Sequence, residues 1–349
     1  MKILYISNYE PWKLVSKGLM PSNHLFGINE ILDRLTEDER GQWHGKFEDG
    51  IVDFVYVKNF DAKQTLKYYV LACHYDVVYD VLNVISKYVG LIPKCLRPFK
   101  LVSILHHPPF DTQLKYASSD AYIFFSQALM NIAKDAFPSM QDKMFVNEWR
   151  PDYDYYHRDV KQELKYDFID CGRTNRDHKT VIQALIATES KGLFFDKKRI
   201  LEQKQYEIKE GINTFFYKDN FIPDNQYVNL MKSAKVMVLA LPKSDKILGP
   251  LGATVIMDAL GLGMPIICSD NSYCSELVER EGLGLVYKAE DPASLALCMN
   301  ELKNEQRYNE CKQNIVKYNL GGDLLNYSKK LMRIFYKVLN KKENEENEE

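Results

Sequence analysis

A short segment in the second half of the chain places two arginines where they can bind phosphate. Arg173 and Arg176 lie three positions apart, directly after a strand-like run at 166–170. Guanidinium groups hold phosphate oxygens through charge-assisted hydrogen bonds that are often bidentate. Two arginines on a loop are also common at a solvated edge, so this segment predicts a site only together with a partner elsewhere in the chain.

The partner segment, residues 249–270, combines a glycine-bearing turn with the start of a helix. Its pattern predicts a helix that begins at Ala253 or Thr254 and stops at 261–263, followed by a buried strand. Small residues in the turn let the backbone approach a ligand, and a helix N-terminus supplies free N–H groups with a partial positive charge. The residues expected to bind a diphosphate there are Leu251, Gly252, Ala253 and Thr254.

Asp258 lies about one helical turn beyond that N-terminus. A carboxylate at this position can accept hydrogen bonds from ribose hydroxyls, so the two segments together favour a nucleoside-diphosphate site. The alternative is an ordinary connection between a strand and a helix, with Asp258 solvated.

The elements that would position these residues form an α/β pattern. Short β-rich runs alternate with amphipathic helical stretches, which is typical of parallel sheets. Strands are expected at 3–6, 54–57, 77–79, 101–105 and 121–125, and in the second half at 166–170, 214–216, 236–241 and 265–268. Ligands of doubly wound sheets bind beyond the carboxyl ends of the strands, where both segments fall.

The predicted domain boundary lies in the polar, aromatic, proline-containing segment 149–156. We expect an N-terminal Rossmann-like domain at 1–152 and a C-terminal domain at 153–323, which contains both candidate segments. A closing helix at 324–340 is expected to pack back toward the first domain. The charged residues 341–349 are expected to form a disordered tail.

Composition excludes several classes of protein. The length of 349 residues predicts about two domains. The 46 Lys and Arg nearly balance 48 Asp and Glu, which argues against a nucleic-acid binder. Seven cysteines without a C-x-x-C pair favour a reduced, cytoplasmic protein. No secretory signal and no apolar run of membrane-spanning length is expected.

The order of these motifs resembles the retaining family 4 class of the group 1 glycosyltransferases. The resemblance covers most of the chain and is strongest over 166–320. It rests on Gly172-Arg173, Arg176, 215–221, 228–242, 258–270, 284–287 and 291–295. It implies the α/β GT-B fold, with two Rossmann-like doubly wound parallel-sheet domains facing a central cleft.

The same resemblance implies a function. The expected reaction moves a hexose-type sugar from a nucleoside-diphosphate sugar to a hydroxyl of a glycan or lipid-linked acceptor, with retention at the anomeric carbon. Surface polysaccharide or glycoconjugate assembly is the expected setting. The nucleotide sugar is then a co-substrate, and no metal or other cofactor is expected.

The resemblance makes 153–323 the nucleotide-sugar donor domain and implies roles for several of its residues. Arg173 and Arg176 would clamp the diphosphate, Arg176 taking the place usually held by lysine. Asp258 stands where the family has the second glutamate of an E-x7-E motif, which binds the ribose. The first glutamate falls at Pro250, a departure that shifts the expected contacts to backbone groups of 251–254. The loop flanking the base corresponds to Asn220 and Phe221.

In the first half, the resemblance implies the acceptor site and one histidine facing the donor sugar. The strand after Lys100 ends at His106 and His107; His106 is the better match and His107 a close alternative. Neither has metal-ligand spacing with another histidine or cysteine. In the long loop after the first strand, the candidates for contact with donor phosphate or acceptor are Gly18, Asn23 and His24. Ser22 or Asn23 is also a candidate N-cap of a helix running through Leu35.

One feature is independent of the resemblance. Residues 81–110 contain no acidic residue, while basic side chains alternate with apolar and aromatic ones; the cations are Lys87, Lys94, Arg97 and Lys100. Such a basic amphipathic stretch favours contact with an anionic membrane, which would place the protein at the inner face of the cell membrane. An ordinary surface with snorkelling lysines is the alternative.

Three other functions are compatible with parts of the pattern. A sugar-nucleotide epimerase of the same fold would release nucleotide and epimerised sugar without an acceptor. A catalytically silent nucleotide-sugar-binding protein is favoured by Pro250. A dinucleotide oxidoreductase is disfavoured, because no G-x-G-x-x-G follows the first strand.

Overall fold

The computed structural model describes residues 1–58, 61–106, 119–157, 163–171, 175–195, 211, 213–216, 224–244 and 251–340. The chain forms two compact units. The first unit is Met1–Arg150 together with the C-terminal segment that begins at Leu324, and the second is Pro151–Asp323. A C-terminal segment therefore completes the N-terminal unit.

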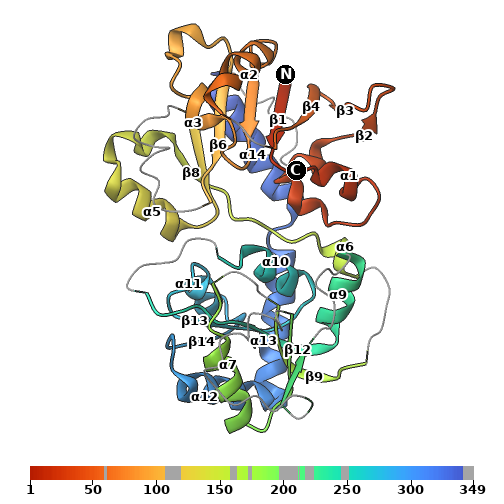
Figure 1. Cartoon of the computed structure of the whole chain (residues 1–349), viewed down its shortest axis with the longest axis vertical. Helices are drawn as coiled ribbons and strands as arrows, with labels where there is room; N and C mark the ends of the chain where they lie inside the picture. The colour runs from red at the N-terminus through yellow and green to blue at the C-terminus, as the bar shows by residue number, and fades with distance from the viewer. Residues whose placement is uncertain are drawn as a thin grey trace. The chain divides into compact units, whose positions relative to one another are not determined.

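The first unit is built on a largely parallel sheet (Figure 1). Its strands are β1 (Lys2–Ser7), β2 (Arg34–Glu37), β3 (Trp43–Phe47), β4 (Gly50–Tyr56), β5 (Val77–Asp80), β6 (Lys100–Ile104), β7 (Ala121–Phe124) and β8 (Met144–Val146). The order is β2-β3-β4-β1-β5-β6-β7-β8. Strands β4 to β8 run parallel with β1, whereas β2 and β3 form an antiparallel edge.

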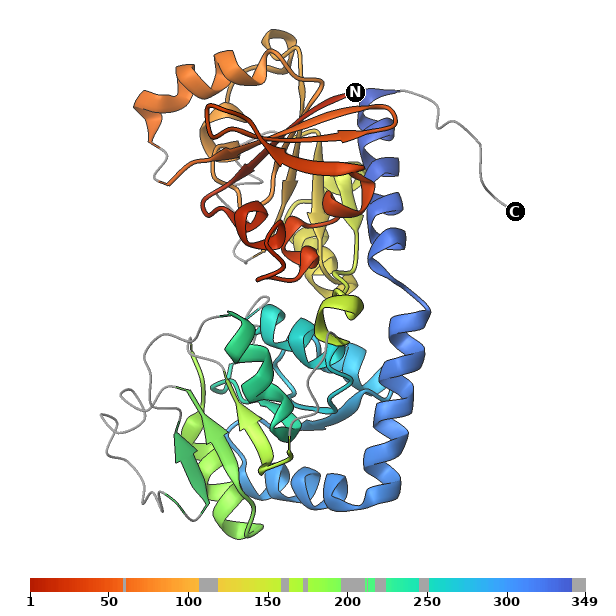
Figure 2. The same cartoon turned by 90° about the vertical axis from the view of Figure 1, so that its right-hand side faces the viewer.

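Short helices connect these strands. They are α1 (Pro11–Val15), η1 (Ser22–Leu25), η2 (Asn29–Ile31), η3 (Ala62–Gln64), α2 (Thr65–Ala72), α3 (Ser86–Val89), η4 (Lys94–Leu96), α5 (Gln127–Ala136) and η5 (Pro138–Lys143). The longer C-terminal helix α14 (Leu324–Leu339) lies along the sheet of this unit (Figure 2). Its buried Phe335 contacts Tyr79 of β5 edge to face, at 5.3 Å between ring centroids.

The helix predicted to run through Leu35 is wrong. The segment instead forms the two short turns η1 and η2 and then enters β2. Gly27 has a φ of +85°, and a Cβ there would lie 2.7 Å from the ring of Tyr327 in α14. The helical turn ends at Phe26 and Gly27, which both have positive φ, and the Tyr327 ring leaves no room for a side chain at position 27.

The second unit contains a parallel sheet ordered β11-β10-β9-β12-β13-β14. The strands are β9 (Tyr166–Asp170), β10 (Gly192–Phe194), β11 (Thr214–Phe216), β12 (Ala234–Leu239), β13 (Ile266–Ser269) and β14 (Gly284–Tyr287). The helices are α6 (Tyr153–His157), α7 (His178–Ala187), α9 (Asp224–Lys232), α10 (Ala253–Gly261), α11 (Ser275–Arg280), α12 (Pro292–Lys303) and α13 (Glu305–Leu320). One face packs its apolar side chains against α7 and α12 (Figure 1).

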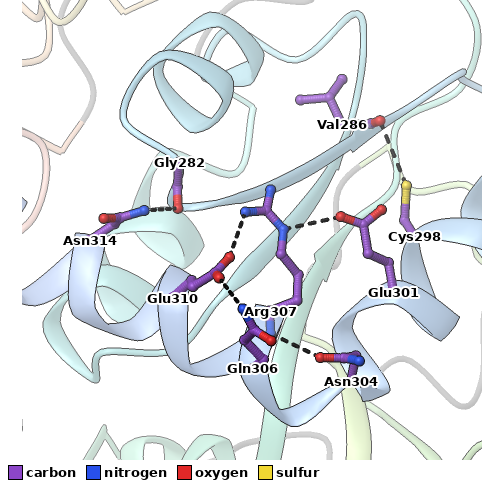
Figure 3. A network of polar contacts seen from close by, with 9 residues as sticks. All are labelled: Gly282, Val286, Cys298, Glu301, Asn304, Gln306, Arg307, Glu310 and Asn314. Atoms are coloured by element: carbon purple, nitrogen blue, oxygen red, sulfur yellow. Dashed lines mark hydrogen bonds and ion pairs between the residues drawn. The ribbon is translucent and has the colours of Figure 1, made fainter.

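A network of polar contacts holds the junction of α12 and α13 (Figure 3). Asn304 caps α13 by accepting a hydrogen bond from the N–H of Arg307 at 3.2 Å. Arg307 pairs with Glu301 at 3.0 Å and with Glu310 at 3.3 Å. All three charged side chains are substantially exposed, so each pair contributes little stability on its own. Asn314 donates to the carbonyl of Gly282, which ties α13 to the turn before β14.

The basic stretch differs from its sequence interpretation at one position. Arg97 is 7% exposed, and its guanidinium has no hydrogen-bond partner among the described residues. Burial lowers its pKa, although the carboxylate of Asp120 partly offsets this effect. Arg97 is therefore not one of the surface cations, whereas Lys87 and Lys94 are exposed.

Candidate functional site

The strand order of the second unit places its switch point between β9 and β12. From β9 the sheet extends through β10 to β11 on one side, and from β12 through β13 to β14 on the other. Connections that leave adjacent strands in opposite directions open a crevice at the carboxyl ends of those strands. The segments that follow β9 and β12 meet there, because the N–H of Asp177 donates to the carbonyl of Ala240 at 3.0 Å.

Arg176 and the N-terminus of α10 come together at this edge. Gly252 is the N-cap residue of α10 and has a φ of +84°, which side-chain-bearing residues rarely adopt. A Cβ at Gly252 would lie 2.5 Å from Leu239 of β12 and 3.1 Å from Nη2 of Arg176. The glycine thus lets the guanidinium approach the positive end of the helix dipole, and together they form an anion-binding corner.

Helix α10 has the bounds that its sequence predicts, Ala253–Gly261. Leu251 directly precedes the N-cap residue Gly252, and Ala253 and Thr254 begin the helix. The predicted backbone donors therefore lie together at the N-terminus of α10. Asp258 lies further along the helix and is buried, with 8% of its surface exposed. Its Oδ1 accepts a hydrogen bond from the hydroxyl of Tyr156 in α6. Asp258 is therefore held by a protein group and is not a solvated side chain.

Sequence reasoning missed the tyrosines around Asp258. Tyr156 lies in the segment interpreted as a linker, and its partner is 102 residues away in the chain. Tyr227 of α9 interacts electrostatically with Asp258, Tyr156 and the thiol of Cys171. Burial raises the pKa of the Cys171 thiol, which stays protonated at neutral pH. The available signal was the aromatic run at 153–156 immediately before the second unit.

A buried pair beneath the arginine loop was also missed. Asp170 ends β9 and His178 begins α7, and Nδ1 of His178 donates to Oδ2 of Asp170 at 2.8 Å. Both side chains are almost fully buried. Asp177 caps the same helix by accepting from the N–H of Thr180 at 3.1 Å. These bonds fix both ends of the loop that carries Arg176.

Several predicted donor-site residues lie outside the described residues: Arg173, Asn220, Phe221 and Pro250. His107 of the first unit also lies outside them.

In the first unit, His106 lies just beyond β6, at the carboxyl edge of the sheet. Its Nε2 donates to the carbonyl of Val81 at 2.6 Å, so in the neutral ring Nδ1 is the acceptor. The imidazole contacts Phe26 and Phe125 edge to face, at 5.6 Å and 4.9 Å between ring centroids. Those two rings stack with Trp149 at 5.3 Å each. This aromatic stack was not predicted.

The same stack positions the loop after β1. Trp149 donates from Nε1 to the backbone carbonyl of Asn23 at 2.8 Å and contacts the His24 ring edge to face. The hydroxyl of Tyr9 lies 3.3 Å from Nδ1 of His24. Burial lowers the pKa of His24 to about 4, so its ring is neutral at pH 7. The structure therefore brings together three of the predicted residues, His106, Asn23 and His24.

Two of the candidates in that loop differ in their surroundings. The side-chain amide of Asn23 is fully buried and has no hydrogen-bond partner among the described residues. An unsatisfied buried amide is costly, and such groups are frequent where a ligand binds. Gly18 is exposed at the end of α1 with a φ of +65°, which accounts for the glycine as a turn residue.

Metal and membrane features were sought in the part of the chain that the structure describes. No group of three or more His, Cys, Asp or Glu side chains there has an arrangement that would hold a metal ion. Within the same residues, no helix combines the length and apolar character needed to cross a membrane.

The chain is similar to a known protein family and to several solved structures. Residues 195–318 match the protein family described as glycosyl transferases group 1. No curated protein matches the chain in sequence. The family match lies within the second unit and includes α10 and Gly252 at its N-terminus, whereas Arg176 precedes the matched residues.

Solved structures resemble both units. Anabaena Alr3699/HepE in complex with UDP has a TM-score of 0.64 at 16% identity, covering 97% of this chain and 100% of that chain. A glycosyltransferase from Rickettsia africae has a TM-score of 0.64 at 12% identity, covering 97% and 98%. A structure from E. coli described as trehalose-6-phosphate bound with UDP-2-fluoro glucose has a TM-score of 0.67 at 9% identity, covering 96% and 99%.

At these identities the likeness shows the fold. The protein has the GT-B fold, with two Rossmann-like α/β units. The family match in the second unit supports the class of group 1 glycosyltransferases.

Proposed function

We propose that this protein is a glycosyltransferase that takes a sugar from a nucleoside-diphosphate sugar and attaches it to a hydroxyl of a glycan or lipid-linked acceptor. The observation that carries the proposal is the corner formed by Arg176, Gly252 and the N-terminus of α10. Two of the structures of similar fold described above were solved with UDP or with UDP-2-fluoro glucose, which supports this class of donor.

The corner suits the chemistry of the departing diphosphate. Negative charge builds up on this group as the glycosidic bond breaks, and preorganised cations and N–H groups stabilise that charge. We propose that Arg173 and Arg176 act with 251–254 in this way, with no metal ion required. Backbone groups at 251–254 would also replace the glutamate whose place Pro250 takes.

The finer features of the reaction follow the resemblance described above. We propose transfer with retention, in which the leaving phosphate accepts the proton of the acceptor hydroxyl. His106 would contact the donor sugar, as the resemblance implies, with its ring orientation fixed by the hydrogen bond from Nε2 to the carbonyl of Val81. We also propose that the loop with Gly18, Asn23 and His24 contacts the donor phosphate or the acceptor. Polysaccharide or glycoconjugate assembly is the setting that we propose.

The test is a transfer assay with UDP-, GDP- and ADP-sugars and an acceptor glycan mixture, using nucleotide release as the readout. We expect Arg173→Ala and Arg176→Ala each to lower kcat/KM about 100-fold, as is typical of lost oxyanion-type stabilisation. The melting temperature should stay near that of wild type, because Arg176 lies between β9 and α7 and belongs to neither element.

Arg307→Ala is the matched control, since it removes an exposed arginine from the same unit. Near-normal transfer by both Arg173→Ala and Arg176→Ala would exclude the proposed role of these arginines in binding the diphosphate. Nucleotide release with an epimerised sugar and no acceptor would favour the epimerase alternative. Tight donor binding without any turnover would favour the silent binding protein.

We also propose that the first unit contacts an anionic membrane surface. Helix α2 and the turn η3 before it place Lys63, Leu66, Lys67 and Val70 at i, i+3, i+4 and i+7, so all four share one exposed face. The hydroxyl of Tyr69 in α2 donates to the carbonyl of Leu96 in η4, which joins this face to the basic stretch.

The joined surface, here called the α2–η4 face, is both apolar and basic. It consists of exposed Leu66, Val70, Leu91 and Leu96 with Lys63, Lys67, Lys87 and Lys94, of which Lys94 pairs with Asp120 at 2.9 Å. No acidic residue occurs in 62–75 or 81–110. Each well-placed lysine contributes about 1 kcal/mol of attraction to an anionic leaflet, and the apolar side chains add burial at the interface.

A further inference from the structure

Tyr156 makes a contact that a linker residue would not need. Its hydroxyl donates to Oδ1 of Asp258 from α6, the short helix that opens the second unit. Both residues are buried, with 1% of Tyr156 exposed. Asp258 is the acidic residue of α10 and follows the first residue of that helix, Ala253, by five positions.

The ring of Tyr156 is fitted to α10 at a second point. Gly261 lies three residues after Asp258 and therefore on the same face of α10. A Cβ at Gly261 would lie 2.1 Å from Cδ2 of the Tyr156 ring. The ring rests directly on the helix backbone at the glycine, and the hydroxyl is thereby directed toward Asp258.

The surroundings keep Tyr156 a hydrogen-bond donor. Burial raises its pKa well above the ordinary value for tyrosine, and the neighbouring carboxylate of Asp258 raises it further. The phenol is therefore protonated at every pH at which the protein would work. Donation to one carboxylate oxygen fixes the plane of the carboxylate, because rotation about its terminal bond would break the hydrogen bond.

We propose that Tyr156 is a positioning residue that directs the Asp258 carboxylate at the ribose of the donor nucleotide. This inference rests on the proposed function, since it requires a nucleotide at the α10 corner. Tyr156 does not itself touch the nucleotide; it determines which way Asp258 presents its oxygens.

Tyr156→Phe is the informative variant, because it keeps the ring on Gly261 and removes only the hydroxyl. Calorimetry would compare UDP, GDP and ADP with their 2′,3′-dideoxy counterparts for wild type and variant. We expect wild type to bind one ribonucleotide about tenfold more tightly than its dideoxy form. In Tyr156→Phe the ratio of these two affinities should fall close to one. The ribonucleotide should bind more weakly, while the affinity for the dideoxy nucleotide should change little.

The ribose preference separates positioning from a structural role. If Tyr156 had a merely structural role, Tyr156→Phe would weaken the binding of both nucleotides equally and lower the melting temperature. Asp258→Asn should lose the preference as well, and the double variant should show no further loss. Tyr308→Phe is the control, since it removes a tyrosine hydroxyl from α13, where the ring packs against the apolar cluster of α7, α12 and the sheet.

The outcomes distinguish the positioning role of Tyr156 from the proposed function on which it rests. If wild type shows a ribose preference that Tyr156→Phe keeps, the positioning role is wrong and the proposed function stands. If Tyr156→Phe binds the ribonucleotide more tightly, the tyrosine competes with ribose for Asp258, and the inference is overturned. If wild type binds none of the three nucleotides, the proposed function fails and this inference with it.

Discussion

His24 couples the loop after β1 to the stability of the first unit. Its pKa is lowered to about 4 by burial, whereas a histidine in an unfolded chain titrates near 6.5. Between these two pH values the unfolded chain binds a proton that the folded protein does not. The free energy of unfolding should therefore fall as the pH is lowered through this window, and His24 should have no such effect above it.

We expect the contribution of His24 to be on the order of 2 kcal/mol between pH 6.5 and pH 4, after allowing for partial exposure of the ring. Urea unfolding at pH 7 and at pH 4.5 would measure it. His24→Gln cannot titrate, so its stability should differ less between the two pH values. An equal pH dependence in wild type and His24→Gln would contradict the assignment.

The glycines of the α10 corner show how single residues without a side chain shape the candidate site. At Gly252 both the positive φ and the approach of Arg176 exclude a Cβ. At Gly261 the backbone conformation is ordinary and only the ring of Tyr156 excludes one. The first glycine is recognisable from its place at a helix start, and the second only from the packing of α6.

At the scale of elements, α6 packs directly against α10, with the ring of Tyr156 on the backbone of Gly261. Gly261→Ala would raise the helix propensity of α10 by about 1 kcal/mol. The added methyl would also push the Tyr156 ring away, which should cost about 2 to 3 kcal/mol. We expect a net loss of about 1 to 2 kcal/mol in the free energy of unfolding, measured by urea denaturation, with weaker nucleotide binding.

Gly321→Ala is the matched control for this comparison. Gly321 follows α13, has a negative φ of −77°, and would place its Cβ at ordinary contact distances of 3.4 Å or more. Its replacement should leave stability and nucleotide binding nearly unchanged. A Gly261→Ala variant as stable as wild type would show that α6 repacks without cost.

The element predictions succeeded where the pattern is local. Four strands of the second half, β9, β11, β12 and β13, and the bounds of α10 follow from apolar runs and glycine stops in the local sequence, whereas the strands β10 and β14 were not predicted. The predicted helix through Leu35 failed because Gly27 turns the chain to make room for Tyr327, a residue 300 positions later. The antiparallel strands β2 and β3 were also missed. The edge strand β2 has no buried side chain, and β3, which lies between β2 and β4, buries only alternate residues.

At the scale of the whole molecule, the α2–η4 face predicts binding to anionic vesicles. Co-sedimentation would compare phosphatidylcholine vesicles with vesicles that also contain phosphatidylglycerol. We expect binding only to the anionic vesicles, falling as the salt concentration rises. Lys63→Glu with Lys87→Glu should reduce the bound fraction about tenfold or more, because each reversal replaces attraction by repulsion.

Leu66→Ser tests the apolar part of the α2–η4 face, and Leu297→Ser is its control on an equally exposed leucine of α12. The first should weaken vesicle binding and the second should not. Equal binding by wild type and the double lysine variant would refute the membrane contact. Equal loss in both leucine variants would indicate non-specific adsorption.

Local chemistry in the sequence determined the alternation of strands and helices, the α10 N-terminus and the identity of the charged candidates. These features depend on neighbours within a few residues, so the chain order contains them. Tertiary structure alone decided that Arg176 lies against Gly252, that Tyr156 holds Asp258, and that His106 and His24 share one aromatic stack. Each of these contacts joins residues far apart in the chain, and only the packing of the sheets determines which distant side chains meet.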